Sequence, residues 1–321
     1  MLEFIMLVGI PASGKSTYAK ELEKNGYHIH SSDEIRKELT GDENTQVVNE
    51  KVFQVLHKRI KSDLEQGISC IYDATNMSMK RRISFLKEIN KYDCHKKCVL
   101  FVTPVEICKE RNQNRERKVP DSVFDKMLKQ FQCPYYYEGW DKIEIMEFDG
   151  VYPDDMLNPC KRYKDGSIIQ FDQENSHHTL SLEDHMVKAY RIFWSLLSWG
   201  ETRSRDRQMA MSDAIVVHDI GKYFTKTFID SKGNKTDEAH YYGHENWGAY
   251  VMLSLMNNGR ANGDWLGTGH ALRSAVFINW HMRPHTAWKQ SEKSRERDKR
   301  LIGEEMYNDI MLLHNADLAA H

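Results

Sequence analysis

The chain has 321 residues, of which 40% are hydrophobic and 29% charged, and its formal net charge is −2. The length is enough for about two domains that each bury a core. The near-balanced charge excludes a basic surface spread over the whole molecule, so any contact with nucleic acid needs a local basic patch.

The first half of the chain alternates strand and helix signals. The apolar run at residues 2–10 is too short for a membrane span and predicts a buried first strand. Further strands are expected at "ISCIYDATN" and "KCVLFV", and helices at about 15–24, 49–66 and from 105 onward. Alternating strands and helices predict right-handed crossovers, and therefore an α/β domain at residues 1–150 with helices flanking a parallel sheet.

The pattern changes near residue 150. Residues 151–176 begin with "VYPDDMLNPCKRYKDGS", whose prolines and turn formers are typical of a linker. Beyond it, helices are expected at about 181–198, 206–220, 244–257, 270–281 and 296–315. Eleven of the fifteen histidines lie from His177 onward. We therefore expect an all-α domain at residues 177–321 whose chemistry differs from that of the first domain.

The six cysteines are irregularly spaced and form no C-x-x-C pair. Together with the lack of a signal-peptide pattern, this spacing favours reduced thiols and a cytoplasmic location without a membrane anchor.

A phosphate-binding loop is predicted at "GIPASGKS", residues 9–16, which fits G-x-x-x-x-G-K-[ST] between a strand and a helix. Glycines let backbone amides close around an anion, and the helix N-terminus adds partial positive charge. Lys15 would reach the β- and γ-phosphates, and Ser16 would coordinate Mg²⁺. We expect ATP or another nucleoside triphosphate, with Mg²⁺, at Gly9, Ser13, Gly14, Lys15, Ser16 and Thr17.

Charged residues that could complete a kinase site follow the later strands. Asp33 in "HSSDEIRKEL" is expected at the carboxyl edge of the sheet, where it could accept a proton from an attacking hydroxyl, or simply cap a helix. Asp73 ends a buried strand and is suited to contact Mg²⁺ or water. The arginine-rich "CKERNQNRERKVP" lies where a lid would clamp a transferring phosphoryl group.

These motifs resemble the kinase domain of the bacteriophage-type polynucleotide kinases over residues 1 to about 150. The matching pieces are "GIPASGKS", D-x-x-R at Asp33 and Arg36, "DATN" with Arg81 and Arg82, and R-N-x-x-R at Arg111 to Arg115. The resemblance implies that Asp33 is the general base for a 5′-hydroxyl. It implies that Arg36 contacts a 3′-phosphate of the acceptor and that Arg115 is a lid arginine on the donor phosphates.

The second half carries histidines and aspartates in a fixed order of segments. His185 is followed by "VVHDIGK", with His218, Asp219 and Lys222; then come His244, His281 and Asp317. Imidazoles and carboxylates suit first-row divalent metals, and a carboxylate can bridge two ions. Because each of these residues lies in or beside an apolar helix, we expect them to converge in the core of a bundle.

This order resembles the HD phosphohydrolase superfamily over most of residues 177–321. The resemblance implies that His185, His218, Asp219 and Asp317 bind a divalent transition metal (Mn²⁺, Ni²⁺, Co²⁺ or Fe²⁺), and that His244 and His281 bind a second metal or contact the substrate. Lys222 and Arg283 would meet a phosphate, and the metal would lower the pKa of a water that attacks phosphorus. The D-x-G-K form is closer to the HD domains of CCA-adding enzymes, which act on 2′-phosphates and 2′,3′-cyclic phosphates of RNA ends, than to the (p)ppGpp hydrolases.

Together the resemblances imply a bifunctional enzyme that heals RNA or DNA ends for a separate RNA ligase. One domain would phosphorylate a 5′-hydroxyl, and the other would hydrolyse a 2′- or 3′-phosphate or a 2′,3′-cyclic phosphate. Two alternatives stay open. One is a small-molecule or nucleoside kinase fused to an HD nucleotidase, and the other is a nucleotide-sensing regulator whose sites bind without turnover.

Overall fold

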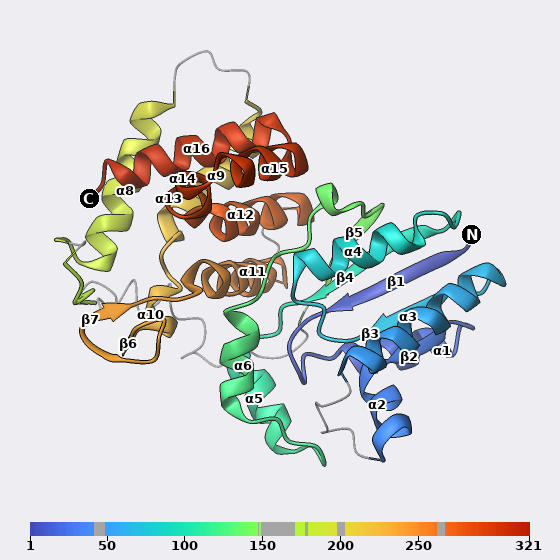
Figure 1. Cartoon of the computed structure of the whole chain (residues 1–321). Coiled ribbons are helices and arrows are strands. Elements are labelled where there is room, and N and C mark those ends of the chain that lie inside the picture. Colours follow the sequence, from blue (N-terminus) through green and yellow to red (C-terminus); the bar gives the residue numbers. More distant parts are fainter. Residues whose placement is uncertain (42–48, 147, 149–170, 177–178, 198–202, 262–266) are drawn as a thin grey trace. The chain divides into compact units, whose positions relative to one another are not determined.

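The computed structural model describes the chain except residues 42–48, 147, 149–170, 177–178, 198–202 and 262–266, and it describes only the backbone of residues 257–261. The chain divides into two compact units (Figure 1). Met1–Phe124 and Pro134–Phe148 form the first unit, and Asp125–Cys133 and Asp149–His321 form the second. Among the described residues, no helix has both the length and the apolar character needed to cross a bilayer.

A parallel sheet of five strands, in the order β2-β3-β1-β4-β5, forms the centre of the first unit. Its strands are β1 (Glu3–Val8), β2 (His28–Ser31), β3 (Cys70–Asp73), β4 (His95–Phe101) and β5 (Lys142–Met146). The helical elements of this part of the chain are α1 (Lys15–Glu23), α2 (Ser32–Thr40), α3 (Asn49–Glu65), α4 (Met79–Ile89), α5 (Val105–Gln113), α6 (Asp121–Leu128) and the short 3₁₀ helix η1 (Tyr136–Glu138).

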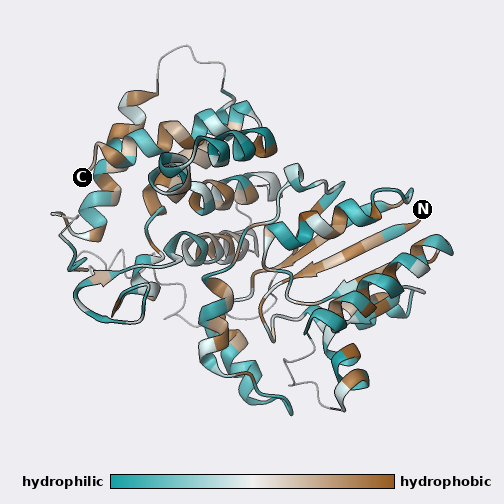
Figure 2. Ribbon diagram, viewed as in Figure 1, coloured by the Kyte–Doolittle hydropathy of each residue, from teal (hydrophilic) through white to brown (hydrophobic). Residues whose placement is uncertain are grey.

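The central strands are apolar because both faces of the sheet are covered by helices. In β1, Phe4 to Val8 are all at most 1% exposed. On one face, Ala19 of α1 packs with Ile5, Leu7 and other sheet residues, and on the other Phe85 of α4 contacts Phe4 at a ring-centroid distance of 5.5 Å. Figure 2 shows the brown central strands beneath helices that turn teal faces outward. The expected α/β domain is therefore present, with β5 as a strand that the sequence patterns did not indicate.

The second unit is mainly helical. Its helices are α8 (Leu182–Leu196), α9 (Arg205–Val217), α10 (Lys222–Thr225), α11 (His244–Ala261), α12 (Thr268–Trp280), α13 (Met282–His285), α14 (Ala287–Gln290), α15 (Glu292–Ile302) and α16 (Glu304–Leu318). The hydrophobic residues Met186, Ala214 and Ile310 of α8, α9 and α16 are buried, as expected for helices that share a core.

Three features of this unit differ from the sequence predictions. An antiparallel hairpin of β6 (Thr227–Ile229) and β7 (Lys235–His240) interrupts the helices. The single helix expected at 296–315 is two helices, because Gly303 has a φ of 85° and ends α15. Residues 171–176 of the expected linker pack in the second unit, where the main chain of Phe171 accepts a hydrogen bond from Leu182 and Phe171 packs on Met186.

The segment Asp125–Cys133 also packs with the second unit, although the sequence boundary at residue 150 assigns it to the first. Asn279 Oδ1 accepts a hydrogen bond from the Cys133 amide at 2.7 Å, and the Phe131 and Tyr250 rings meet edge to face at 5.3 Å. The five described cysteines are buried thiols, and Cys160 lies outside the described residues.

Candidate functional site

The loop after β1 has the backbone that a phosphate-binding loop needs. Gly14, at the N-cap of α1, has a φ of 104°, a left-handed conformation that favours glycine. At Gly9, a Cβ atom would lie 3.0 Å from the carbonyl oxygen of Phe101, so the loop passes against β4. Both predicted glycines are therefore required by local geometry.

Lys15 of this loop and Asp73 at the end of β3 are buried charged groups, at 8% and 7% exposure. Lys15 Nζ donates to the carbonyl oxygen of Ile10 at 2.7 Å, and Ser16 Oγ donates to Asp73 Oδ2 at 3.1 Å. Burial lowers the pKa of Lys15 and raises that of Asp73. A polyphosphate beside Lys15 and Mg²⁺ beside Ser16 and Asp73 would each stabilise the charged form of these groups, so the residues present fit a bound Mg²⁺–nucleotide.

Asp33 does not cap α2, because Ser31 is the N-cap and accepts a hydrogen bond from the Glu34 amide. Asp33 instead pairs with two arginines: its Oδ1 lies 2.6 Å from Arg36 NH1, and its Oδ2 lies 2.6 Å from Arg117 NH1. Partial burial opposes the negative charge of Asp33, but the arginine contacts outweigh it and lower the pKa.

Arg36 is 5% exposed and also donates to Asn49 Oδ1 at 3.0 Å, so α2 and α3 hold it in place. Arg115 is exposed, and its positive charge acts on Lys15 and Asp73. Arg117, which was not singled out in the sequence, is the arginine of the segment 108–120 that contacts Asp33. An arginine-rich stretch does not reveal which member turns toward the site.

Arg82 is one of the arginines that follow "DATN" in the pattern resembling polynucleotide kinases, but its surroundings are not those of a phosphate-binding residue. Its side chain is fully buried and pairs in two places with Glu138, from NH2 at 2.6 Å and from Nε at 2.8 Å. Trp140 Nε1 donates to the same carboxylate at 3.1 Å. This network anchors η1 to α4 and leaves Arg82 a structural role in the first unit.

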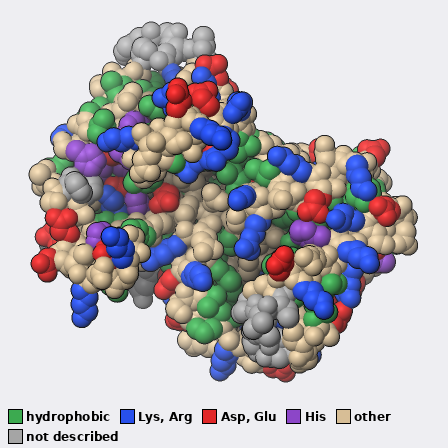
Figure 3. Space-filling view, viewed as in Figure 1, with side chains coloured by type: hydrophobic (Ala, Val, Ile, Leu, Met, Phe, Trp, Pro, Cys, Tyr) green, Lys and Arg blue, Asp and Glu red, His purple; other side chains and the backbone are tan. Residues whose placement is uncertain are grey.

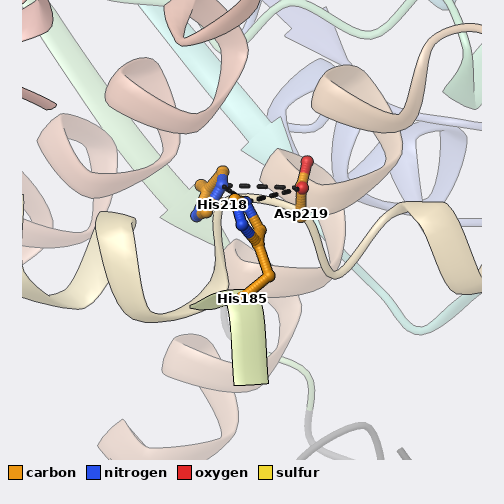
Figure 4. A group of neighbouring side chains, drawn as sticks. All are labelled: His185, His218 and Asp219. Carbon is orange, nitrogen blue, oxygen red and sulfur yellow. Dashed lines mark hydrogen bonds and ion pairs between the residues drawn. The ribbon is translucent and has the colours of Figure 1, made fainter. Parts of the chain in front are cut away.

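Six predicted residues of the second unit converge at one place. They come from α8 (His185), the turn after α9 (His218 and Asp219), the first residue of α11 (His244), the end of α12 (His281) and α16 (Asp317). All are at most 6% exposed. Figure 4 shows His185 and His218 turned toward Asp219, and Figure 3 shows histidines beside acidic and basic side chains in a hollow of this unit's surface.

The distances define two neighbouring groups that share Asp219. His185 Nε2 and His218 Nε2 are 3.2 Å apart, and each lies 3.5 Å from Asp219 Oδ2. On the other side of the carboxylate, Asp219 Oδ1 lies 3.1 Å from His244 Nε2 and 3.6 Å from His281 Nε2. Each group has the ligand atoms to hold a metal ion, and the shared carboxylate is suited to bridge two.

Three of the imidazoles are oriented by main-chain carbonyl groups close to them in the sequence. The Nδ1 atoms of His218, His244 and His281 lie 2.7 to 2.8 Å from the carbonyl oxygens three residues earlier. A histidine that donates from Nδ1 presents an unprotonated Nε2, which is the form that binds a metal. The Nε2 atoms face the shared carboxylate, so the orientation matches ligation.

The electrostatics of this cluster indicate a place for a cation. Asp317 Oδ1 lies 3.0 Å from His185 Nε2 and 3.3 Å from His218 Nε2, yet this buried oxygen has no donor in hydrogen-bond geometry among the described residues. Burial opposes charge on His218, but Asp219 and Asp317 raise its pKa to about 9. Asp219 and Asp317 therefore favour a positive charge beside the imidazoles. A divalent metal would supply this charge and leave the imidazoles neutral, so the residues present fit such an ion.

Gln173, His285 and His321, which were not among the candidate ligands, also lie around the cluster. Gln173 is 1% exposed and accepts from Lys222 Nζ at 3.0 Å, while Lys222 Nζ also lies 2.6 Å from Asp219 Oδ2. His285 Nε2 lies 2.8 Å from Asp317 Oδ2, and His321 Nε2 lies 3.7 Å from Asp317 Oδ1. Gln173 lies far from any motif, so only the folded chain reveals it.

Arg283 forms an ion pair with Asp298. Its Nε donates to Asp298 Oδ2 at 3.1 Å, and its guanidinium lies 5.6 Å from the Trp280 ring centre. The predicted phosphate contact by Arg283 would therefore have to compete with Asp298.

The loop, its lysine and the helix-flanked parallel sheet fit a P-loop kinase domain, a class that uses a nucleoside triphosphate and Mg²⁺. Residues 4–134 match the family model described as "AAA domain".

Two relatives and one solved structure show the extent of similarity. The chain is 22% identical to L-seryl-tRNA(Sec) kinase of Methanococcus maripaludis over 73% of this chain and 92% of that protein. It is 30% identical to a protein of Acanthamoeba polyphaga mimivirus named for a bifunctional polynucleotide phosphatase/kinase, over 46% of this chain but only 33% of that protein. A solved Pnkp1/Rnl/Hen1 RNA repair complex matches 40% of this chain and 43% of its own, at 24% identity and a TM-score of 0.37.

Proposed function

We propose that the chain is a bifunctional RNA end-healing enzyme. Its first unit would transfer the γ-phosphate of a nucleoside triphosphate to a 5′-hydroxyl end, and its second unit would hydrolyse a 2′- or 3′-phosphate or a 2′,3′-cyclic phosphate. The observation that carries the proposal is the presence of two separate charged sites: the loop with Lys15 and Asp33, and the cluster around Asp219. The similarity to a named polynucleotide phosphatase/kinase supports the acceptor in the kinase half.

In the kinase half, Asp33 would accept the proton of the 5′-hydroxyl group while the hydroxyl oxygen forms a bond to the γ-phosphorus. The bond from that phosphorus to the β-phosphate oxygen breaks, and the nucleoside diphosphate leaves. Lys15 and Arg115 would balance the negative charge on the transferred group. Arg36, held by Asn49, would fix the acceptor beside Asp33.

In the hydrolytic half, His185, His218, Asp219 and Asp317 would hold one divalent metal, and Asp219, His244 and His281 a second or the substrate. A metal bound there would polarise a phosphate oxygen and lower the pKa of a water molecule. Lys222 would hold Asp219 in position and offer positive charge to the phosphate. Burial of the cluster keeps bulk water out and strengthens these interactions.

A kinase with a different acceptor is the second candidate. It is supported by the similarity to L-seryl-tRNA(Sec) kinase, which extends over 92% of that relative. Within this candidate, the net charge of −2 favours a small-molecule or nucleoside acceptor over a tRNA. In this case the second unit would act as a nucleotidase.

One experiment separates these functions. Transfer of labelled γ-phosphate is measured to a 5′-hydroxyl oligoribonucleotide, free nucleosides and seryl-tRNA, beside hydrolysis of an RNA with a 2′,3′-cyclic phosphate end in Mn²⁺, Ni²⁺ or Co²⁺. We expect the oligoribonucleotide to be preferred and the cyclic end to be opened. Lys15→Ala should abolish only transfer, and Asp219→Ala only hydrolysis; loss of both activities in either variant would contradict two independent sites.

A further inference from the structure

The segment that follows the metal-ligand candidate His281 carries an unusual concentration of positive charge. Met282–Ile302, which covers α13, α14 and α15, contains seven Lys and Arg residues against three Asp and Glu residues, a net of +4 in a chain whose net charge is −2. Figure 3 shows basic side chains gathered over this region of the second unit, with acidic ones beside them.

Three of these residues form a row on the exposed side of α15, which we call the basic row: Lys293, Arg297 and Arg300. Their spacing of four and three residues places them on one helix face. At 1.5 Å per residue the row extends about 10 Å along the helix. The opposite side is anchored, because Asp298 and Ile302 are buried.

The acidic residues nearby do not neutralise the row. Glu292 and Glu296 pair with Arg295, at 3.3 and 3.7 Å, and Glu304 pairs with Lys299 at 3.0 Å. Asp298 contacts Arg297 at 3.0 Å but is also shared with Arg283 and with Trp288 Nε1. Among the described residues, Lys293 and Arg300 have no carboxylate within ion-pair distance. Helix α15 therefore presents uncompensated cations to solvent.

Helix α15 is tied to the metal-ligand cluster through α13. Helix α13 directly follows His281. Its Arg283 pairs with Asp298 of α15, and its last residue, His285, contacts Asp317. Figure 3 shows the hollow with the histidines and the basic side chains over α13 to α15 on the same face of the second unit, so an RNA chain whose end enters the hollow can extend over this face. A row of cations of this kind suits a flexible polymer that carries regularly spaced negative charges.

We propose that the basic row binds the phosphodiester backbone of a single-stranded RNA whose 3′ end occupies the cluster around Asp219. The proposal rests on the proposed function of the second unit and adds that this unit selects polynucleotides over mononucleotides. Cations at phosphates raise affinity without reading sequence, so the row would not discriminate among bases.

The test compares two substrates of the same chemistry. The full chain and its Lys293→Ala/Arg297→Ala/Arg300→Ala variant are assayed with a 2′,3′-cyclic-phosphate oligoribonucleotide and with the corresponding 2′,3′-cyclic mononucleotide. We expect KM for the oligomer to rise about tenfold or more at low salt, with the mononucleotide kinetics unchanged. Three lost phosphate contacts would also reduce the slope of log affinity against log salt by about 2.

Matched controls keep the test specific. Arg295→Ala removes an arginine of the same helix that pairs with Glu292 and Glu296, and we expect no change in oligomer KM or in salt slope. Equal changes for the oligomer and the mononucleotide, or an unchanged salt slope in the triple variant, would overturn the proposal and leave the row for a protein partner.

The outcome also separates the row from the proposed function. If the wild-type chain hydrolyses neither cyclic substrate, the proposed function fails, and the row is then judged by fluorescence anisotropy with the same labelled oligoribonucleotide. Weaker and less salt-dependent binding by the triple variant than by Arg295→Ala would support the row; equal binding would overturn it.

Discussion

Asp33 Oδ2 lies 2.6 Å from Arg117 NH1, while the other oxygen of the same carboxylate lies 2.6 Å from Arg36. Both oxygens of the proposed general base are therefore held by cations. Burial of the carboxyl works against its ionisation, but the two arginines lower its pKa. A carboxylate held this way is ionised at neutral pH, and it would become a better proton acceptor if one arginine contacted a phosphate instead.

Arg117→Ala should move the acid limb of kinase activity to higher pH. The limb reports protonation of Asp33 in the free enzyme, and loss of one cation lets the pKa return toward its ordinary value near 4. The measurement is the pH profile of kcat/KM for transfer to a 5′-hydroxyl oligoribonucleotide.

Arg115→Ala is the matched control, since Arg115 belongs to the same segment but is exposed and acts by charge on Lys15 and Asp73. It should lower the rate and leave the acid limb in place. An unshifted limb in Arg117→Ala would show that Asp33 does not titrate in that step.

Gly221→Ala should damage the second unit and its metal binding. A Cβ atom at Gly221 would lie 1.9 Å from the carbonyl oxygen of His244 and 2.8 Å from the Gly248 amide nitrogen, so the start of α11 would have to shift. Overpacking of this kind costs about 1–3 kcal/mol or more. Urea unfolding and metal titration check both effects.

The control for this glycine is Gly269→Ala in α12. At Gly269 no atom lies within 4 Å of an added Cβ, and its backbone is helical. The replacement should be neutral or stabilise the chain by about 0.4–1 kcal/mol. Equal effects of the two substitutions would contradict the close contact at Gly221.

The parts of this structure that could be predicted are those that local sequence determines. The phosphate-binding loop is one, because glycine positions and the strand before them fix its backbone within residues 9–16. The order of histidine segments also indicated which side chains lie together, since each segment is an apolar helix that must turn one face inward. Their roles as ligands stay a prediction.

The parts that could not be predicted depend on contacts distant in sequence. Arg82 and Glu138 are 56 residues apart, and nothing near either residue indicates a buried pair. Gln173 reaches Lys222 from a segment typical of a linker. The β6–β7 hairpin has no clear apolar pattern, because β6 has only three residues and most of β7 is polar; its local signal is the turn in which Asp230 Oδ1 accepts from the amides of Lys232 and Asn234.

His285→Ala should weaken metal binding without removing a proposed ligand. His285 Nε2 contacts Asp317 Oδ2 at 2.8 Å, on the oxygen that faces away from His185 and His218. Groups that orient a ligand in this way contribute about 10- to 100-fold to metal affinity. Calorimetric titration with Mn²⁺ or Ni²⁺ measures the loss.

His314→Ala is the comparison for His285, because His314 Nδ1 lies 3.1 Å from His285 Nε2 and has no ion pair with Asp317 among the described contacts. It should reduce affinity less than His285→Ala. Unchanged affinity in His285→Ala would show that Asp317 is positioned by the other histidines alone.

His270 should make the stability of the second unit depend on pH, away from the metal-ligand cluster. It is 3% exposed; its Nε2 lies 2.7 Å from Asp213 and its Nδ1 lies 3.1 Å from Asp206, which also pairs with Arg273. The hydrogen bond to Asp213 is the main cause of a raised pKa, opposed by burial and supported by Asp206. With both nitrogens donating to carboxylates, the folded chain favours imidazolium.

A raised folded-state pKa gives stability that is fully present below the unfolded-state value of about 6.5 and is lost as pH rises through the folded-state value. The free energy of unfolding of the wild type should therefore fall between about pH 6 and pH 8 relative to His270→Gln. His240→Gln is the control, because His240 stacks on Tyr242 and forms no ion pair within the described residues. Urea unfolding at both pH values gives the difference. If the free energies of unfolding of the wild type and His270→Gln changed with pH in parallel, His270 would be neutral in the folded chain. Either Asp206 or Asp213 would then receive no proton from it.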